Sequence, residues 1–166
     1  KESGPTNQEL PSYAHAVGAV YRNSDPSDIV VTAAGGLVGE VVQIWKPKEL
    51  NTFETEWGFS CMSYEISGAL GIKMAKPDQD VIVFVGDGSY LLQNSDIYSS
   101  ILYDKKLIIV VCDNGGHMVI NRLQLAKGGN EYLCNLNAAR ATNVQFVDFE
   151  AHAKSMGANG ETVKSI

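Results

Sequence analysis

Two short glycine-rich segments carry the residues best suited to chemistry in this sequence. The first has the sequence Gly-Asp-Gly-Ser at 86–89, and the second has Asp-Asn-Gly-Gly at 113–116. Each follows an apolar run rich in β-branched residues, of the kind that forms a buried strand. Asp87 and Asn114 offer a carboxylate and an amide, and Mg²⁺ prefers such hard oxygen ligands. The pattern therefore predicts a site for a divalent cation that carries a diphosphate.

The elements that must position this site follow from the apolar periodicity. Runs at 28–32, 81–85 and 107–111 are typical of buried strands. Continuous apolar strands that alternate with helices indicate a parallel sheet covered on both faces, so we expect an α/β three-layer sandwich. In such a sheet, ligands bind beyond the carboxyl ends of the strands, where both segments lie. The helices expected are at 10–22, 37–45, 62–74 and 90–103, the last with Leu91, Tyr98, Ile101 and Leu102 on its packing face.

Two familiar phosphate-binding motifs and a hairpin turn fit the first segment less well. A dinucleotide fingerprint needs a glycine where this sequence has Leu91, and no Walker-type Gly-Lys-Ser/Thr occurs. Asp87-Gly88 alone is compatible with a hairpin turn, but the helical periodicity after it disfavours a second strand there.

The predicted metal site needs six oxygen ligands. Asp87 is expected to supply one carboxylate oxygen, Asn114 one amide oxygen, and the main-chain carbonyl near Gly116 a third. Two diphosphate oxygens and a water would complete the set.

The same turn is suited to phosphate. Gly86 and Gly88 allow the backbone to approach phosphate oxygens closely. The following helix presents unpaired N–H groups at its start. Ser89 is expected either to add a hydroxyl donor or to cap this helix.

Composition limits the class of protein. The 166 residues are 45% hydrophobic with a net charge of −6 and no basic run, so we expect one domain over 10–166, behind a linker at 1–9, and no nucleic-acid partner. No apolar stretch approaches the ~20 residues of a membrane span. Three widely spaced cysteines disfavour a disulfide framework and favour a cytoplasmic setting. Both ends look truncated from a longer polypeptide.

The two segments together resemble the cofactor signature of the thiamine diphosphate (ThDP) enzymes. That signature is Gly-Asp-Gly followed, after some two dozen residues, by an Asn pair, whose first member is Asp113 here. The resemblance covers almost the whole chain and implies the diphosphate-binding (PP) domain, with ThDP and Mg²⁺ as cofactors. It assigns Asp87, Asn114 and the Gly116 carbonyl to the metal, and it assigns Gly88 and Ser89 to the diphosphate. The main-chain N–H of His117, directly after the metal turn, is also expected to face the diphosphate.

The resemblance also implies contacts with the rest of the cofactor. The segment 58–62 corresponds to the family's aminopyrimidine segment, in which the Ser60 carbonyl would accept from the 4′-amino group and Met62 would bend the cofactor. The alternative is that Met62 is simply part of a helix core. The strand end at 33–39 lacks the polar side chains of acetolactate synthases, so main-chain donors at Gly36 and Leu37 are expected to replace them.

Two stretches, 54–65 and 120–124, are similar to the trihydroxycyclohexanedione hydrolases of myo-inositol catabolism, which cleave a C–C bond of a cyclic 1,2-dione. Two alternatives stay open: an acetolactate synthase-like 2-oxo acid lyase, and a noncatalytic Mg²⁺–diphosphate binding module. The roles of Arg122 and Gln124, and of the His117 side chain, also stay open.

The resemblance implies that no catalytic residue lies in this chain. The family's activating glutamate belongs to a pyrimidine-binding domain of the same or a second subunit, so we expect a homodimer or homotetramer acting on a small-molecule substrate. The chain alone is expected to be inactive and to bind ThDP weakly.

Overall fold

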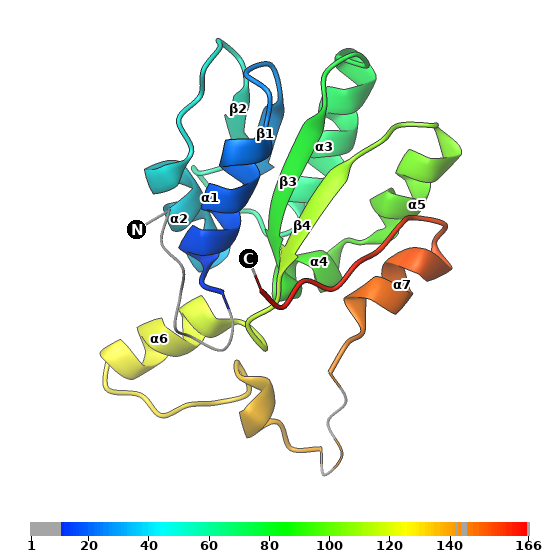
Figure 1. Ribbon diagram of the computed structural model, residues 1–166. Coiled ribbons are helices and arrows are strands. Elements are labelled where there is room, and N and C mark those ends of the chain that lie inside the picture. Colours follow the sequence, from blue (N-terminus) through cyan, green and yellow to red (C-terminus); the bar gives the residue numbers. More distant parts are fainter. Residues whose placement is uncertain (1–10, 142, 144–145, 166) are drawn as a thin grey trace.

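A four-stranded parallel sheet forms the centre of the molecule (Figure 1). The computed structural model describes residues 11–141, 143 and 146–165, so the expected linker at 1–9 lies outside the described residues. The strand order is β2-β1-β3-β4, and helices flank the sheet, which confirms the predicted α/β class. The strands are β1 (Ile29–Thr32), β2 (Phe53–Thr55), β3 (Val81–Gly86) and β4 (Ile108–Cys112).

One face of the sheet packs against α1 (Tyr13–Asn23) and α2 (Gly35–Ile44). Val30, Ile82 and Phe84 belong to this core, because alternate residues of a strand point to the same face. Burying them against two helices removes apolar surface from water, which stabilises the face by about 25 cal/mol per Å².

The opposite face carries α3 (Tyr64–Ala75), α5 (Ser95–Leu102) and α7 (Phe149–Ser155). Val31 and Val83, the neighbours of the residues above, lie in this second core. The fully buried β3 is therefore apolar at every position from 81 to 85, as expected for a central parallel strand.

The single helix predicted over 90–103 is wrong. The chain forms α4 (Asp87–Leu92) and α5, separated by Gln93 and Asn94, and α4 begins at Asp87 itself. The break changes which residues face inward: Tyr90 and Ile97 are buried. The residues expected to pack, Leu91, Tyr98, Ile101 and Leu102, are exposed.

Beyond β4 the chain leaves the sheet as an arm, defined here as residues 113–141 (Figure 1). It contains α6 (Met118–Ala126) and a short 3₁₀ helix (Leu136–Ala138). An antiparallel bridge between Gly116 and Asn135 joins its two ends. Within the described ranges, no helix has the length and apolar character needed to cross a bilayer.

Candidate functional site

Asp87 lies where β3 ends and α4 begins, and its side chain is only 5% exposed. Its Oδ2 accepts a hydrogen bond from the Gly116 N–H at 2.7 Å. The structure therefore brings the two predicted turns into contact at the carboxyl edge of the sheet.

Burial and neighbouring groups shift the pKa of the Asp87 carboxylate. Burial raises its pKa above the ordinary value, and the nearby Asp113 acts in the same direction. The backbone N–H groups of Gly116, Gly88 and Asn114 act in the opposite direction because they stabilise the ionised form. Across the part of the chain that the structure describes, no cationic side chain forms an ion pair with this carboxylate. A bound cation would compensate the buried charge.

Asn114 is oriented by a residue that sequence analysis did not single out. Its Nδ2 donates to the hydroxyl oxygen of Tyr13, at the start of α1. The amide oxygen of Asn114 is thereby left for another partner. Burial raises the pKa of Tyr13, so this hydroxyl stays neutral.

Gly116 has a conformation that other residues rarely adopt. Its φ is +136°, and an added Cβ would lie 2.4 Å from the carbonyl oxygen of Cys134. Its own carbonyl accepts from the Met118 N–H at 3.0 Å and keeps a second lone pair.

The oxygen atoms of Asp87, Asn114 and Gly116 are suited to bind Mg²⁺. No group of three or more His, Cys, Asp and Glu side chains suited to a metal occurs among the described residues. The candidate set contains one carboxylate, one amide and one carbonyl, all hard oxygens of the kind that Mg²⁺ binds together with phosphate oxygens and water.

Two glycines near these oxygens lie directly against side chains of the arm. A Cβ on Gly36 would lie 2.7 Å from Nη2 of Arg122, and one on Gly88 would lie 2.6 Å from Nδ1 of His117. Both side chains come from the start of the arm, so the arm closes over the two strand ends. A guanidinium and an imidazole over bare backbone form a cradle that suits an anion.

The start of α2 adds main-chain donors to this cradle. Gly36 and Leu37 lie in its first turn, and its N-cap residue, Ala34, makes no side-chain capping bond. The Leu37 side chain is buried in the first core, so only its main chain is available to a ligand.

Ser89 does not cap a helix. It lies inside α4, whose N-cap is Gly86, and its side chain is 3% exposed. Its hydroxyl donates to Oε2 of Glu65 at 2.9 Å and accepts from the Ser63 N–H at 2.7 Å. Sequence analysis missed Glu65, although an acidic residue beside the apolar positions of a helix's first turn was a usable signal.

The predicted aminopyrimidine segment forms a loop before α3. Met62 precedes the helix and is 36% exposed, so the alternative of a helix-core residue is wrong. Ser60 has a φ of +50°. The loop is held by Glu56, which accepts from the N–H groups of Cys61 at 2.6 Å and Phe59 at 2.9 Å.

Gln124 is the one open residue that stays apart from the cradle. Its carbonyl accepts from the Gly129 N–H and its Cγ packs beside Gly129, at the far end of α6. In the structure it contacts the turn that follows α6.

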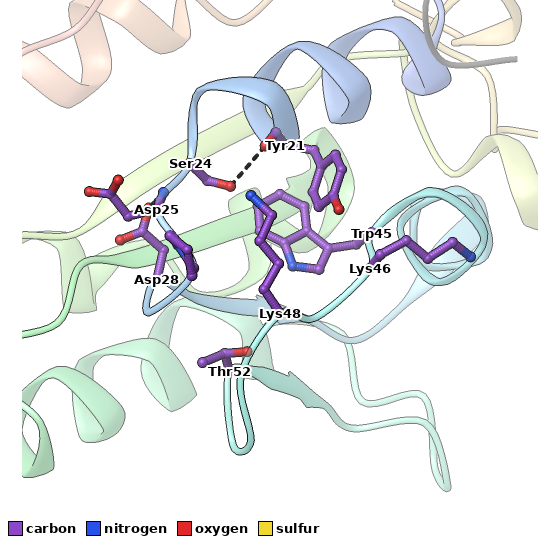
Figure 2. Close-up of a pocket in the computed structure, with 9 residues that line it drawn as sticks. Tyr21, Ser24, Asp25, Asp28, Trp45, Lys46, Lys48 and Thr52 are labelled. Atoms are coloured by element: carbon purple, nitrogen blue, oxygen red, sulfur yellow. Dashed lines mark hydrogen bonds between the residues drawn. The ribbon is translucent and has the colours of Figure 1, made fainter.

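A hollow lies at the opposite edge of the sheet (Figure 2). Tyr21, Trp45 and Lys48 line it, before β1 and β2 begin, and the Ser24 hydroxyl donates to the Tyr21 carbonyl across one side. It contains none of the predicted site residues.

The geometry at the carboxyl edge is matched by the family comparison. The family described as "Thiamine pyrophosphate enzyme, C-terminal TPP binding domain" matches residues 33–166. The chain belongs to the thiamine pyrophosphate enzyme family. The matched residues include every position assigned above to the cation and the cradle, from Gly36 to Arg122.

Within the thiamine pyrophosphate enzymes, the chain is similar to proteins named 3D-(3,5/4)-trihydroxycyclohexane-1,2-dione hydrolase. It is 43% identical to that of Lacticaseibacillus casei over 86% of this chain and 22% of the relative. It is 42% identical to the protein of Listeria innocua, over 80% of this chain and 21% of the relative. It is 36% identical to the protein of Bacillus subtilis (strain 168), over 92% of this chain and 24% of the relative. The chain thus spans 21–24% of the length of these relatives.

Proposed function

We propose that this chain is the PP domain of a ThDP- and Mg²⁺-dependent hydrolase that cleaves a C–C bond of a cyclic 1,2-dione, trihydroxycyclohexanedione, in myo-inositol degradation. The observation that carries the proposal is the contact between Asp87 and Gly116, which joins the two signature turns at the sheet edge. The shared name of relatives 35–43% identical supports the choice of substrate.

In this proposal the cation and the diphosphate share one edge of the sheet. Asp87, the amide oxygen of Asn114 and the Gly116 carbonyl hold Mg²⁺. The Ser89 hydroxyl is already bonded to Glu65, so Ser89 offers only its main-chain N–H to the ligand. The other diphosphate contacts that we propose are the main-chain groups of Gly36, Leu37, Gly86, Gly88 and His117.

The loop before α3 would hold the reactive end of the cofactor. The Ser60 carbonyl would accept a hydrogen bond from the aminopyrimidine, and Met62, which is 36% exposed, would support the bent shape. When bound, ThDP supplies the carbon nucleophile and electron sink that C–C cleavage requires. This chain contributes binding and orientation.

The proposed site is completed by a second domain. We assign the glutamate that activates the cofactor to a pyrimidine-binding domain of the same or a second subunit. We also propose that the full-length enzyme is a homodimer or homotetramer. We further propose a cytoplasmic location, which the free thiols of Cys61, Cys112 and Cys134 support.

The test uses the full-length enzyme with the cyclic dione and, separately, with 2-oxo acids. We expect Mg²⁺- and ThDP-dependent hydrolysis of the dione, and at least a 100-fold loss in Asp87→Ala, because the buried carboxylate is the only acidic metal ligand. Asp25→Ala, at the opposite edge of the sheet, is the control and should retain full activity. Turnover of 2-oxo acids alone would contradict the substrate, and full activity in Asp87→Ala would contradict the site.

A further inference from the structure

Glu65 is a carboxylate with no exposed surface, in the first turn of α3. Its Oε1 accepts from the Ala34 N–H at 3.1 Å, and its Oε2 accepts from the Ser89 hydroxyl at 2.9 Å. Among the described residues no cationic side chain forms an ion pair with it. Both of its oxygens are therefore satisfied by hydrogen bonds from other segments of the chain.

The donors around Glu65 come from three separate segments. Ala34 directly precedes the first turn of α2, and Ser89 belongs to the turn after β3. Ser63 donates its N–H to the same Ser89 hydroxyl oxygen at 2.7 Å, directly after the loop that contains Ser60 and Met62. In the proposed function, the segments of Ala34 and Ser89 hold the diphosphate end of the cofactor, and the loop before Ser63 holds the aminopyrimidine end.

We propose that Glu65 and Ser89 form a positioning pair that sets the distance between the diphosphate end and the aminopyrimidine end of the cofactor site. This inference rests on the proposed function and assigns a role to a residue that touches no ligand. Rigid holding of binding groups before the ligand arrives lowers the cost of binding.

The chemistry of the pair favours positioning over stability. A buried polar cluster is commonly no more stable than well-packed apolar side chains of the same volume. Hydrogen bonds depend on geometry, so a carboxylate that accepts through both oxygens fixes the positions of two donors, here the Ala34 N–H and the Ser89 hydroxyl. Ser89 extends that constraint to Ser63 through its own oxygen.

The test compares Glu65→Gln and Ser89→Ala in the full-length enzyme. Glutamine keeps the shape but has one oxygen where the carboxylate has two, so it cannot accept from both Ala34 and Ser89. We expect each variant to raise the Kd for ThDP, measured calorimetrically at saturating Mg²⁺, about tenfold. Because the residues act as one unit, the double variant should raise the Kd no further. At saturating ThDP, the kcat of Glu65→Gln should stay near that of the wild type.

Lys73→Met is the matched control. Lys73 is a second buried ionisable residue of α3, at its other end, where its Nζ donates to the Gln79 carbonyl at 2.6 Å. Its removal should lower the Tm without changing the Kd for ThDP. Hydrogen exchange of peptides covering 33–37 and 58–63 should rise in Glu65→Gln and stay unchanged in Lys73→Met.

The outcomes separate the two proposals. A wild-type enzyme that binds no ThDP contradicts the proposed function, and this inference with it. A wild type that binds ThDP, together with folded Glu65→Gln and Ser89→Ala variants of unchanged Kd, overturns the positioning role alone. Additive effects in the double variant would also overturn it, because the two residues would then act separately.

Discussion

The turn after β3 and the arm after β4 meet at Asp87, but they are held in different ways. In the turn, Asp87 and Ser89 are 5% and 3% exposed, and Ser89 is bonded through Glu65 to the neighbouring segments. In the arm, Asn114 is exposed, and Asn121 is the only buried residue of α6. The half of the proposed site after β3 is therefore part of the core, whereas the half in the arm lies on the surface of the core.

Because the two halves of the site are held differently, we expect them to respond differently to mutation. Core-anchored groups keep their geometry without ligand, whereas segments with few buried contacts open locally at little free-energy cost. We therefore expect substitutions in the β3 half to change global stability, and substitutions in the arm to change ligand affinity with little change in stability.

The largest expected effect tests the first half of that comparison. Phe84 is fully buried in β3 and packs edge-on against Trp45, with 6.0 Å between the two ring centroids. Phe84→Ala should lower the free energy of unfolding by about 3–5 kcal/mol, because it removes apolar burial and leaves a cavity. Leu123→Ala, in the exposed face of α6, should cost less than about 0.5 kcal/mol. Urea denaturation measures both, and equal losses would contradict the comparison.

The next effect belongs to the arm. Gly116→Ala would place a Cβ against the Cys134 carbonyl at a φ of +136°, so the bridge to Asn135 must shift. Strain of this kind costs about 1–3 kcal/mol, and a loss of about 1.4 kcal/mol in binding is tenfold. We expect the Kd for Mg²⁺ with ThDP to rise at least tenfold.

Gly128→Ala is the control for Gly116→Ala. Gly128 also has a positive φ, +79°, but an added Cβ there meets no atom within 4 Å. It should leave Mg²⁺ affinity unchanged in the same titration. Equal weakening by both variants would mean that the arm responds to backbone strain anywhere, and not to the position of Gly116.

The fold was largely predictable from the sequence, because a fully buried strand such as 81–85 needs an apolar residue at every position. The break in the helix at Gln93 and Asn94 was not. Neither residue is a strong helix breaker, and the register of α5 is set by the packing of Ile97 in the second core. Tertiary contacts decided which face of α5 points inward.

The sequence predicted those site residues that come directly after the strands. Asp87 and Gly116 were expected together and lie in contact. Glu65 and Tyr13 were not expected, because they act through side chains brought from other elements to Ser89 and Asn114. No spacing along the chain encodes those contacts.

A smaller effect tests how the arm is held. Tyr13→Phe removes the acceptor of the Asn114 amide but keeps the ring. The loss of one hydrogen bond, about 1 kcal/mol, should raise the Kd for Mg²⁺ about fivefold without changing the Tm measurably. Tyr103→Phe, on an exposed ring, is the control. A large fall in Tm for Tyr13→Phe would show that Tyr13 belongs to the core half instead.

The smallest effect is a local pH dependence in the loop before α3, which shares features of both halves. The N–H groups of Cys61 and Phe59 lower the pKa of Glu56 because they stabilise its ionised form. A lowered pKa means that the contribution to loop order is complete above the ordinary glutamate value of about 4.3, and is lost as pH falls through the lower folded value. The amide NMR signals of Cys61 and Phe59 should therefore titrate with a midpoint below that ordinary value, and should not titrate in Glu56→Gln. A midpoint at or above it would show that the loop lacks this anchor and belongs with the arm.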